Sequence, residues 1–408
     1  MSEFLVLVTA SDARELLGRF PAVGAERVAL EEADDRVAAV DIAAPEDLPA
    51  WPRATMDGYA VRARDTHGAS EAVPAFLTLR GAVPMGDVWT GGALAPGDAV
   101  SIATGGVVPE GCDAVVMLEY VQAAGADIEV RRSVATGENL MRPGDDVRHA
   151  EIVVPAGRRL RPQEAGVLAA LGVDAVEVHR RPRAGVLATG NEIVSPSVAP
   201  RPGQVRDVNS MALAAQLRRA GADVILGGIV ADDAAALAAA VAGLLERSDL
   251  LLLSGGSSVG ARDLTVEALE RLGAEIVFHG ISVRPGKPTI LARLGDKPIL
   301  GMPGVPVSAM VIFEVFVRPL VWRLGGEPAR EPWPARRRAR MRRRTPSVAG
   351  REDYLRVRFV DTDGGWVEPV LGGSAALGTL VRADGLVVVP AESEGVAEGD
   401  EVEVMLNG

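Results

Sequence analysis

Apolar positions recur with two different spacings along the chain, and the change of spacing divides it into regions. Over residues 183–330, short apolar runs alternate with segments whose apolar positions recur at helical spacing. Strands that alternate with helices of about ten or more residues predict a parallel sheet covered by helices on both faces. The expected strands are GVLATG, DVILGGIV, LLLLSGG, EIVFHG, TILARL and PIL, and the expected helices are VNSMALAAQLRRAG, DDAAALAAAVAGLLERS, DLTVEALERLG and a long helix over residues 306–324.

The rest of the chain is mostly β in pattern. Short apolar runs between many Gly and Pro residues predict an all-β insertion, and YLRVRFV, GLVVVP and EVEVML predict strands near the end of the chain. One helix is expected over residues 162–172, with Pro162 in its first turn. The expected domains are a small linking α/β domain from residues 1–43 and 151–182, whose first helix could pack on the α/β domain, a β-rich insertion domain 44–150, a three-layer α/β domain 183–330 and a C-terminal β-barrel-like domain 331–408.

Composition supports a multidomain protein without a disulfide framework. A length of 408 residues fits two to four domains at about 150 residues each. The single cysteine, Cys112, excludes an intrachain disulfide, and no Cys/His cluster has zinc spacing. The N-terminus has no basic region typical of a signal peptide, and Glu314 and Arg318 interrupt the longest apolar stretch. We therefore expect a cytoplasmic protein with no membrane partner.

The charge of the chain argues against nucleic acid as a partner. The net charge is −12, which repels a polyanion. One exception is ARRRARMRRR at residues 335–344, which would suit either an RNA-binding patch or a solvated strand or linker. No aromatic residue interleaves with these arginines, as a base-stacking surface would require, so the strand or linker is favoured.

The loop SGGSSVGARD at residues 254–263 follows an apolar strand and precedes a helix. Its glycines would let backbone N–H groups approach a ligand closely, and the helix start would favour an anion. Many strand-to-helix turns carry glycine and a capping Asp for structural reasons alone. The two interpretations have equal weight on this loop by itself.

Four further polar loops are expected at the same edge of the sheet, because each of them also follows a strand. Together these loops supply backbone donors, two cations and several carboxylates, which indicates a phosphorylated ligand held partly through Mg²⁺. Neither a GxxxxGK[ST] nor a GxGxxG sequence is present, which argues against a P-loop NTPase and a dinucleotide site. The four are ATGNEIV at 188–194, ADD at 231–233, SVRPGKP at 282–288 and GMPGVPVSA at 301–309.

Motifs spread along nearly the whole chain resemble those of the MoeA family, the molybdopterin molybdenumtransferases. Besides the five loops, they are MDGYAV at 56–61, IATGGVVPEGCDAVVMLE at 102–119, GENLMRPGDDV at 137–147 and GREDYLRV at 350–357. The resemblance implies insertion of molybdate into adenylylated molybdopterin, with release of AMP and formation of the molybdenum cofactor. It also implies Mg²⁺, an elongated four-domain homodimer with a site shared between subunits, and the molybdopterin adenylyltransferase of the preceding step as a further partner.

The resemblance also assigns roles by motif. Asp263 would lie near the metal and pyrophosphate, Ser258 near the dithiolene or molybdate, and Asp57 and Asp146 would come from the region that the partner subunit presents. For the last two, a turn cap is the alternative. The expected catalytic residues are Asp263, Ser258, Asp57, Asp146, Glu192 and Asp232, with Asp263 and Asp232 as metal ligands. The expected substrate-binding residues are Thr104, Thr189, Gly190, Ser254, Gly255, Gly256, Arg284, Lys287, Pro303, Gly304, Ser308, Arg351 and Ser374.

Four positions depart from the family pattern without removing an assigned carboxylate. Val305 stands where Asn is usual, so the GMPGVP loop loses a side-chain donor and acceptor. Arg284 replaces a frequent Lys, Ser257 a usual Val and Asn191 a common Asp.

Two other functions remain open at this point: a molybdopterin adenylyltransferase, since that enzyme shares the α/β domain, and a peptide-binding scaffold similar to the gephyrin E domain. Cys112 is expected to be an inert core residue.

Overall fold

The computed structural model describes residues 7–255, 264–328, 333, 335–361 and 363–406. Contacts divide the chain into two compact units, residues 1–26 with 177–408 and residues 27–176. The chain passes between the units within two strands, β1 (Ala25–Ala29) and β12 (Ala175–His179). The domain boundaries expected from the sequence stay a prediction.

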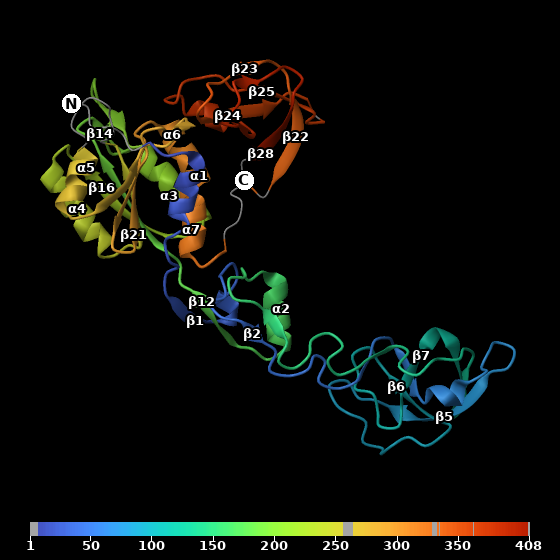
Figure 1. Cartoon of the computed structure of the whole chain (residues 1–408). Helices are drawn as coiled ribbons and strands as arrows, with labels where there is room; N and C mark the ends of the chain where they lie inside the picture. Colours follow the sequence, from blue (N-terminus) through green and yellow to red (C-terminus); the bar gives the residue numbers. More distant parts are fainter. Residues whose placement is uncertain (1–6, 256–263, 329–332, 334, 362, 407–408) are drawn as a thin grey trace. The chain divides into compact units, whose positions relative to one another are not determined.

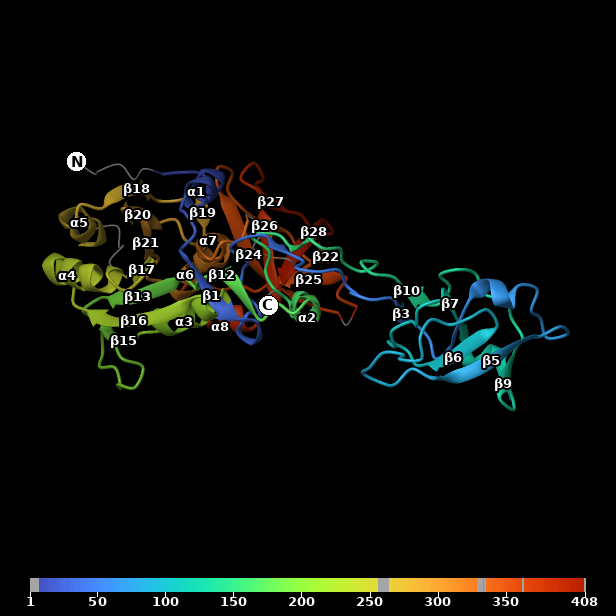
Figure 2. The same ribbon diagram turned by 90° about the horizontal axis from the view of Figure 1, so that it is seen from below.

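The α/β part of the first unit is built on a six-stranded sheet (Figures 1 and 2). Its first four strands are parallel, as the alternating pattern predicts. The prediction is wrong for β20, which runs antiparallel to both of its neighbours. Gly295 and Asp296 alone join β20 to β21, and a two-residue connection can form only a hairpin. The strands in sheet order are β16 (Asp223–Val230), β13 (Arg183–Thr189), β17 (Leu250–Ser254), β21 (Lys297–Met302), β20 (Ile290–Leu294) and β18 (Glu275–His279).

Helices cover both faces of this sheet, so the three-layer prediction is confirmed. Successive residues of β17 point to opposite faces, with Leu252 in one core cluster and Leu251 in the other. On the first face lie α1 (Ala10–Leu17), α3 (Asn209–Arg219), α6 (Pro306–Ile312) and α7 (Arg318–Leu324) (Figure 1). On the second face lie α4 (Ala234–Leu245) and α5 (Leu264–Arg271).

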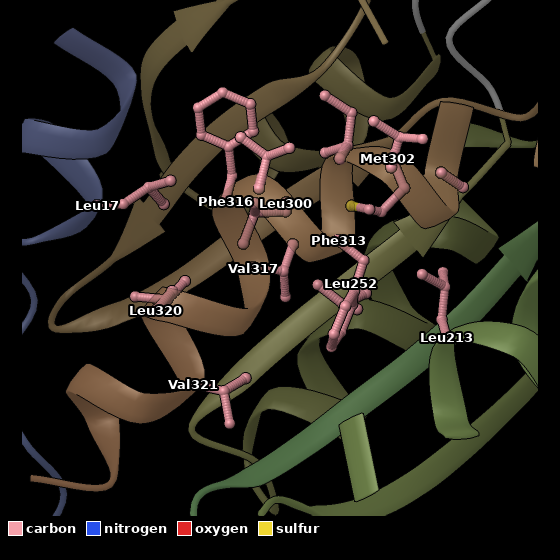
Figure 3. Packing of buried hydrophobic residues seen from close by; sticks show 14 of the residues in the cluster. Leu17, Leu213, Leu252, Leu300, Met302, Phe313, Phe316, Val317, Leu320 and Val321 are labelled. Carbon is pink, nitrogen blue, oxygen red and sulfur yellow. The ribbon is translucent and has the colours of Figure 1, made fainter. Parts of the chain in front are cut away.

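The helix expected over residues 306–324 is present as one helical segment with a π turn in its middle. The π turn covers Phe313–Val317 and separates α6 from α7. Pro319 explains it, because proline has no N–H to donate to the carbonyl of Val315. Phe313, Phe316 and Leu320 nevertheless stay in one core with strand residues such as Leu252 and Leu300 (Figure 3). Within the described residues, no helix has the length and apolar character needed to cross a membrane.

The C-terminal part of the first unit is a closed β-barrel. Its strand order is β24-β25-β22-β28-β26, and β26 pairs again with β24. The short strand β19 (Val283–Arg284) adds to the beginning of β24 in parallel and ties the barrel to the α/β part. The elements are β22 (Arg336–Met341), β23 (Thr345–Pro346), β24 (Glu352–Phe359), β25 (Trp366–Pro369), α8 (Gly378–Val381), β26 (Gly385–Val389), β27 (Gly395–Val396) and β28 (Glu401–Leu406).

The arginine-rich run is a strand of this barrel, as the favoured interpretation predicts. Ala339 and Met341 point into the barrel core, and the arginines between and before them are exposed. Arg336 pairs with Glu403 at 2.6 Å and Arg338 with Glu401 at 3.5 Å, both across the neighbouring strand β28. Alternation along a barrel strand therefore accounts for Arg336, Arg338 and Arg340, whereas Arg337 lies on the inward side before the core begins, with its guanidinium over the Phe359 ring.

The second unit is rich in β structure, as expected for the insertion. Its largest sheet has the order β7-β4-β6-β5-β9-β8, and only the β5–β6 pair is parallel. The sheet strands are β4 (Gly58–Val61), β5 (Ala75–Ala82), β6 (Asp98–Ile102), β7 (Ala114–Met117), β8 (Val121–Ala124) and β9 (Asp127–Val130). The smaller elements are η1 (Leu30–Glu32), β2 (Ile42–Ala43), β3 (Arg53–Ala54), η2 (Ala63–Thr66), η3 (Leu118–Tyr120), β10 (Leu140–Met141), β11 (Ile152–Val154) and the expected helix α2 (Pro162–Ala170).

Candidate functional site

Hydrogen bonds join the loops that follow the adjacent parallel strands β13 and β16. Thr189 Oγ1 donates to Asp232 Oδ1 at 3.2 Å, and the Asn191 N–H donates to Asp232 Oδ2 at 3.2 Å. The Asp232 N–H in turn donates to Asn191 Oδ1 at 3.2 Å. A carboxylate has about four acceptor sites, so Asp232 keeps capacity for a further donor or a cation. The structure thus brings the expected residues Thr189 and Asp232 together.

Glu192 lies close to the backbone of the same loop. Gly190 has a φ of 150°, and a Cβ placed on it would lie 2.9 Å from both carboxylate oxygens of Glu192. The Glu192 side chain is exposed, as Asn191 is. Two carboxylates, Glu192 and Asp232, therefore border one loop at the carboxyl edge of the sheet.

Asn209 connects two of the expected site loops, and the sequence reasoning missed it. Its Nδ2 donates to Ser254 Oγ at 2.7 Å and to the carbonyl of Gly304 at 2.9 Å. Asn209 and Ser254 are 7% and 5% exposed, so these bonds are shielded from water. Asn209 Oδ1 is buried and has no hydrogen-bond partner among the residues that the structure describes. Its position in the sequence could have indicated it, because Asn209 begins the helix that follows the polar loop after β13.

Two glycines let the loop backbones approach each other. Gly255 has a φ of 110°, and a Cβ on it would lie 2.0 Å from the carbonyl oxygen of Thr189. A Cβ on Gly304 would lie 3.7 Å from the Cα of Gly255, which is an ordinary contact. The ends of β13, β17 and β21 therefore meet at Thr189, Gly255 and Gly304, as neighbouring parallel strands require.

Residues 256–263 of the SGGSSVGARD loop lie outside the described residues. This applies to the expected substrate ligand Gly256, to Ser258 and to the expected metal ligand Asp263. The choice between an anion cradle and a structural turn therefore stays a prediction for these positions.

A buried carboxylate of the C-terminal barrel pairs with two expected cations, one from the α/β part and one from the barrel. Asp353 is 1% exposed and accepts from Arg351 Nε at 2.8 Å, while Arg284 Nη1 lies 3.6 Å from its other oxygen. Pairing of β19 with β24 places Arg284 opposite Asp353. Lys287 is exposed, and its carbonyl accepts from the Ile281 N–H at 3.0 Å. The sequence reasoning did not single out Asp353, because its burial results from the folded barrel.

The GMPGVP loop starts helix α6 and contacts the loop that contains Ser374. The Val307 N–H donates to the Ser374 carbonyl at 3.2 Å. Pro303 is buried, and Ser308 is 6% exposed in the first turn of α6. Val305 is the N-cap and makes no side-chain capping bond, which agrees with the expected loss of a donor and acceptor there.

In the second unit, the structure joins Asp57 to Thr104. Asp57 Oδ1 accepts from the Thr104 N–H at 2.7 Å and from its Oγ1 at 2.8 Å. These bonds, the backbone bond first, lower the pKa of Asp57. Thr104 is 47 residues from Asp57 in sequence, so a local turn cap does not account for this arrangement. Asp146 is exposed, and its N–H donates to the Leu48 carbonyl at 3.1 Å.

Cys112 is unsuited to nucleophilic chemistry. It is half-buried beside a small apolar cluster, and burial raises its pKa to about 12. The thiol is therefore protonated at neutral pH, in agreement with the expectation of an inert residue.

The donor set at the carboxyl edge can be tested against Mg²⁺. Among the described residues, no group of three or more His, Cys, Asp or Glu side chains could hold a metal. Mg²⁺ commonly takes only one or two carboxylates and completes its shell with phosphate oxygens and water. The free acceptor capacity of Asp232 and the nearby Glu192 carboxylate fit that mode of binding. They do not fit a cage built from protein ligands alone.

Family models match three consecutive regions of the chain. They are the MoeA N-terminal region (domain I and II) at residues 8–172, the probable molybdopterin binding domain at residues 185–323 and the MoeA C-terminal region (domain IV) at residues 338–406. The chain belongs to the MoeA family. The middle match contains every loop of the carboxyl edge described above, and the last one covers the barrel from within β22 onward.

Relatives in this family align over nearly their whole length. Molybdopterin molybdenumtransferase 1 of Mycobacterium tuberculosis is 36% identical, with 93% of each chain covered. The molybdopterin molybdenumtransferase of Bacillus subtilis is 32% identical, covering 93% of this chain and 89% of the relative. A crystal structure of a molybdopterin biosynthesis MoeA protein from Pyrococcus horikoshii is 36% identical, with a TM-score of 0.83 over 98% of this chain and 100% of that one.

Proposed function

We propose that this MoeA-family chain is a molybdopterin molybdenumtransferase, which inserts molybdate into adenylylated molybdopterin and releases AMP. The observation that carries the proposal is the convergence of Thr189, Asp232, Ser254 and Gly304 at the carboxyl edge of the domain matched as molybdopterin-binding. The relatives named above carry the transferase name, and both flanking MoeA regions are matched. These flanking regions favour the transferase over the adenylyltransferase.

The residues suit a reaction between two anions. Asp232, with Asp263 from the adjoining loop, would hold Mg²⁺, which neutralises phosphate charge when bound. Gly255 and Gly304 let the ends of three strands meet closely, so that the backbone at this edge would form one surface for the pterin phosphate. Arg284 and Arg351 supply positive charge for molybdate, and the buried Asp353 orients both guanidinium groups.

The direct test follows AMP and cofactor formation. The full chain is incubated with adenylylated molybdopterin, molybdate and Mg²⁺, and we expect AMP release that depends on molybdate. Asp263→Ala should keep the fold and lose this release, because it removes a metal ligand.

Asp233→Ala is the matched control for that variant. Asp233 caps α4 by accepting from the Ala236 N–H at 2.7 Å, and it has no assigned role in the site. Its loss should cost about 1 kcal/mol of stability and leave turnover intact. Normal turnover in Asp263→Ala would contradict the metal assignment and leave Asp263 as a helix cap.

We further propose a homodimer whose partner subunit completes the site through Asp57 and Asp146. A chain with Asp57→Ala mixed with a chain with Asp263→Ala should regain part of the activity, since one hybrid site has both carboxylates. Heterodimers that form without any rescue would argue against a shared site. A water-soluble anionic pterin as substrate suits the expected cytoplasmic location and delivery by the adenylyltransferase of the preceding step.

A further inference from the structure

Arg356 makes contacts that none of the roles assigned so far explains. It lies in β24, and its side chain shares the outer face of the barrel with Arg358, because the intervening Val357 points into the barrel core. Arg356 Nη1 donates to Thr379 Oγ1 at 2.6 Å, and Nη2 donates to the Gly372 carbonyl at 2.7 Å. The planar guanidinium thus bonds to two points that are seven residues apart in sequence.

These two bonds hold both ends of the segment 372–379. Thr379 is 1% exposed, and its hydroxyl also donates to the Ala376 carbonyl at 2.6 Å. Gly372 has a φ of 152°, and a Cβ there would lie 2.6 Å from Thr379 Cγ2, so the two ends are in close contact. The helix α8, which begins at Gly378 near the end of this segment, has four residues and is too short to be stable by itself.

The segment contains Ser374 and reaches the candidate site. The Ser374 carbonyl accepts from the Val307 N–H in the first turn of α6, directly after the GMPG turn. The two ends of segment 372–379 are therefore held by Arg356, and its middle is held by α6. Any displacement of the ends is transmitted to Ser374, which is the expected molybdate contact.

The charge of Arg356 also lies near the expected cation Arg284. Arg356 is half-buried, and burial together with the positive charge of Arg284 lowers its pKa. Arg284 and Arg351 contact the buried Asp353, and Arg356 adds a third guanidinium close enough to Arg284 for their charges to interact. The surplus of positive charge is compatible with an oxyanion and unfavourable without one.

We infer that Arg356 is a positioning residue, which fixes the Ser374 segment against α6 so that the oxyanion site of the proposed transferase is formed in advance. The inference rests on the proposed function for the identity of the oxyanion, molybdate. The two-pronged donor geometry carries it, because a lysine could keep the charge but not both bonds.

The test compares Arg356→Lys with Arg358→Lys in the full chain. Arg358 lies two residues further along the same strand and pairs with Glu368 at 2.6 Å, away from the Ser374 segment. We expect Arg356→Lys to speed amide hydrogen exchange over residues 373–379 and to raise the KM for molybdate roughly tenfold, the loss expected for one net hydrogen bond. Arg358→Lys should change neither quantity.

Other outcomes separate this inference from the proposed function. Exchange in Arg356→Lys that matches wild type, or faster exchange with an unchanged KM for molybdate, overturns the inference. No AMP release from the wild-type chain refutes the proposed function instead. If Arg356→Lys fails to fold, Arg356→Met removes both donors while leaving the bond from Thr379 to the Ala376 carbonyl in place, and it should give the same two changes.

Discussion

Replacing Gly255 by alanine should separate the backbones that meet at the carboxyl edge of the sheet. The new Cβ would lie 2.0 Å from the Thr189 carbonyl oxygen, whereas real Cβ contacts are essentially never under 3.0 Å. The ends of β13 and β17 would have to move apart by about 1 Å. Alanine at a φ of 110° adds backbone strain.

The expected cost follows from these two effects. Backbone strain costs roughly 1–2 kcal/mol and overpacking roughly 1–3 kcal/mol, so Gly255→Ala should lose roughly 2–5 kcal/mol. At about 2–4 °C per kcal/mol for a domain of roughly 150–250 residues, that loss lowers Tm by roughly 4–20 °C. Calorimetric unfolding of the full chain measures it.

Gly304→Ala is the matched control. Within the described part of the chain, its Cβ would meet only the Gly255 Cα, at 3.7 Å, and its φ lies outside the range that favours glycine. Gly304→Ala should therefore unfold within about 2 °C of wild type. A Tm for Gly255→Ala that is equally close to wild type would refute the reasoning about the close approach.

Two further predictions concern ionisation. Thr104→Ala removes the hydroxyl bond to Asp57 and keeps the stronger backbone bond, so the pKa of Asp57 should rise only part of the way to its ordinary value. Because the folded pKa is depressed, Asp57 stabilises the fold above its ordinary pKa, and that contribution is lost as the pH falls through the folded pKa. An NMR titration of the Asp57 carboxyl carbon checks this, and a complete return to the ordinary pKa would contradict it. Cys112, with a pKa of about 12 against an ordinary 9.0, should react with iodoacetamide at pH 8 roughly a thousandfold more slowly in the folded chain than in urea. Equal rates by mass spectrometry would contradict its burial.

The sequence by itself determined most of the α/β elements and the edge of the sheet to which the polar loops belong. Hydrophobic spacing is a local property, so it located β16, β17, α3 and the helical segment 306–324 closely. The order of strands and helices then placed the polar loops at one edge, and ordered motifs identified the family. The direction of β20 was also within reach, because two residues cannot connect parallel strands.

Tertiary structure decided which side chains meet. Asn209 bonds to Ser254 and Gly304, Asp353 pairs with Arg284, and Asp57 accepts from Thr104, although the partners in each case are far apart in sequence. Each such contact depends on how strands pair and helices pack, which hydrophobic spacing leaves open. Burial has the same origin, since a carboxylate in GREDY looks like any surface acid until the barrel and β19 enclose it.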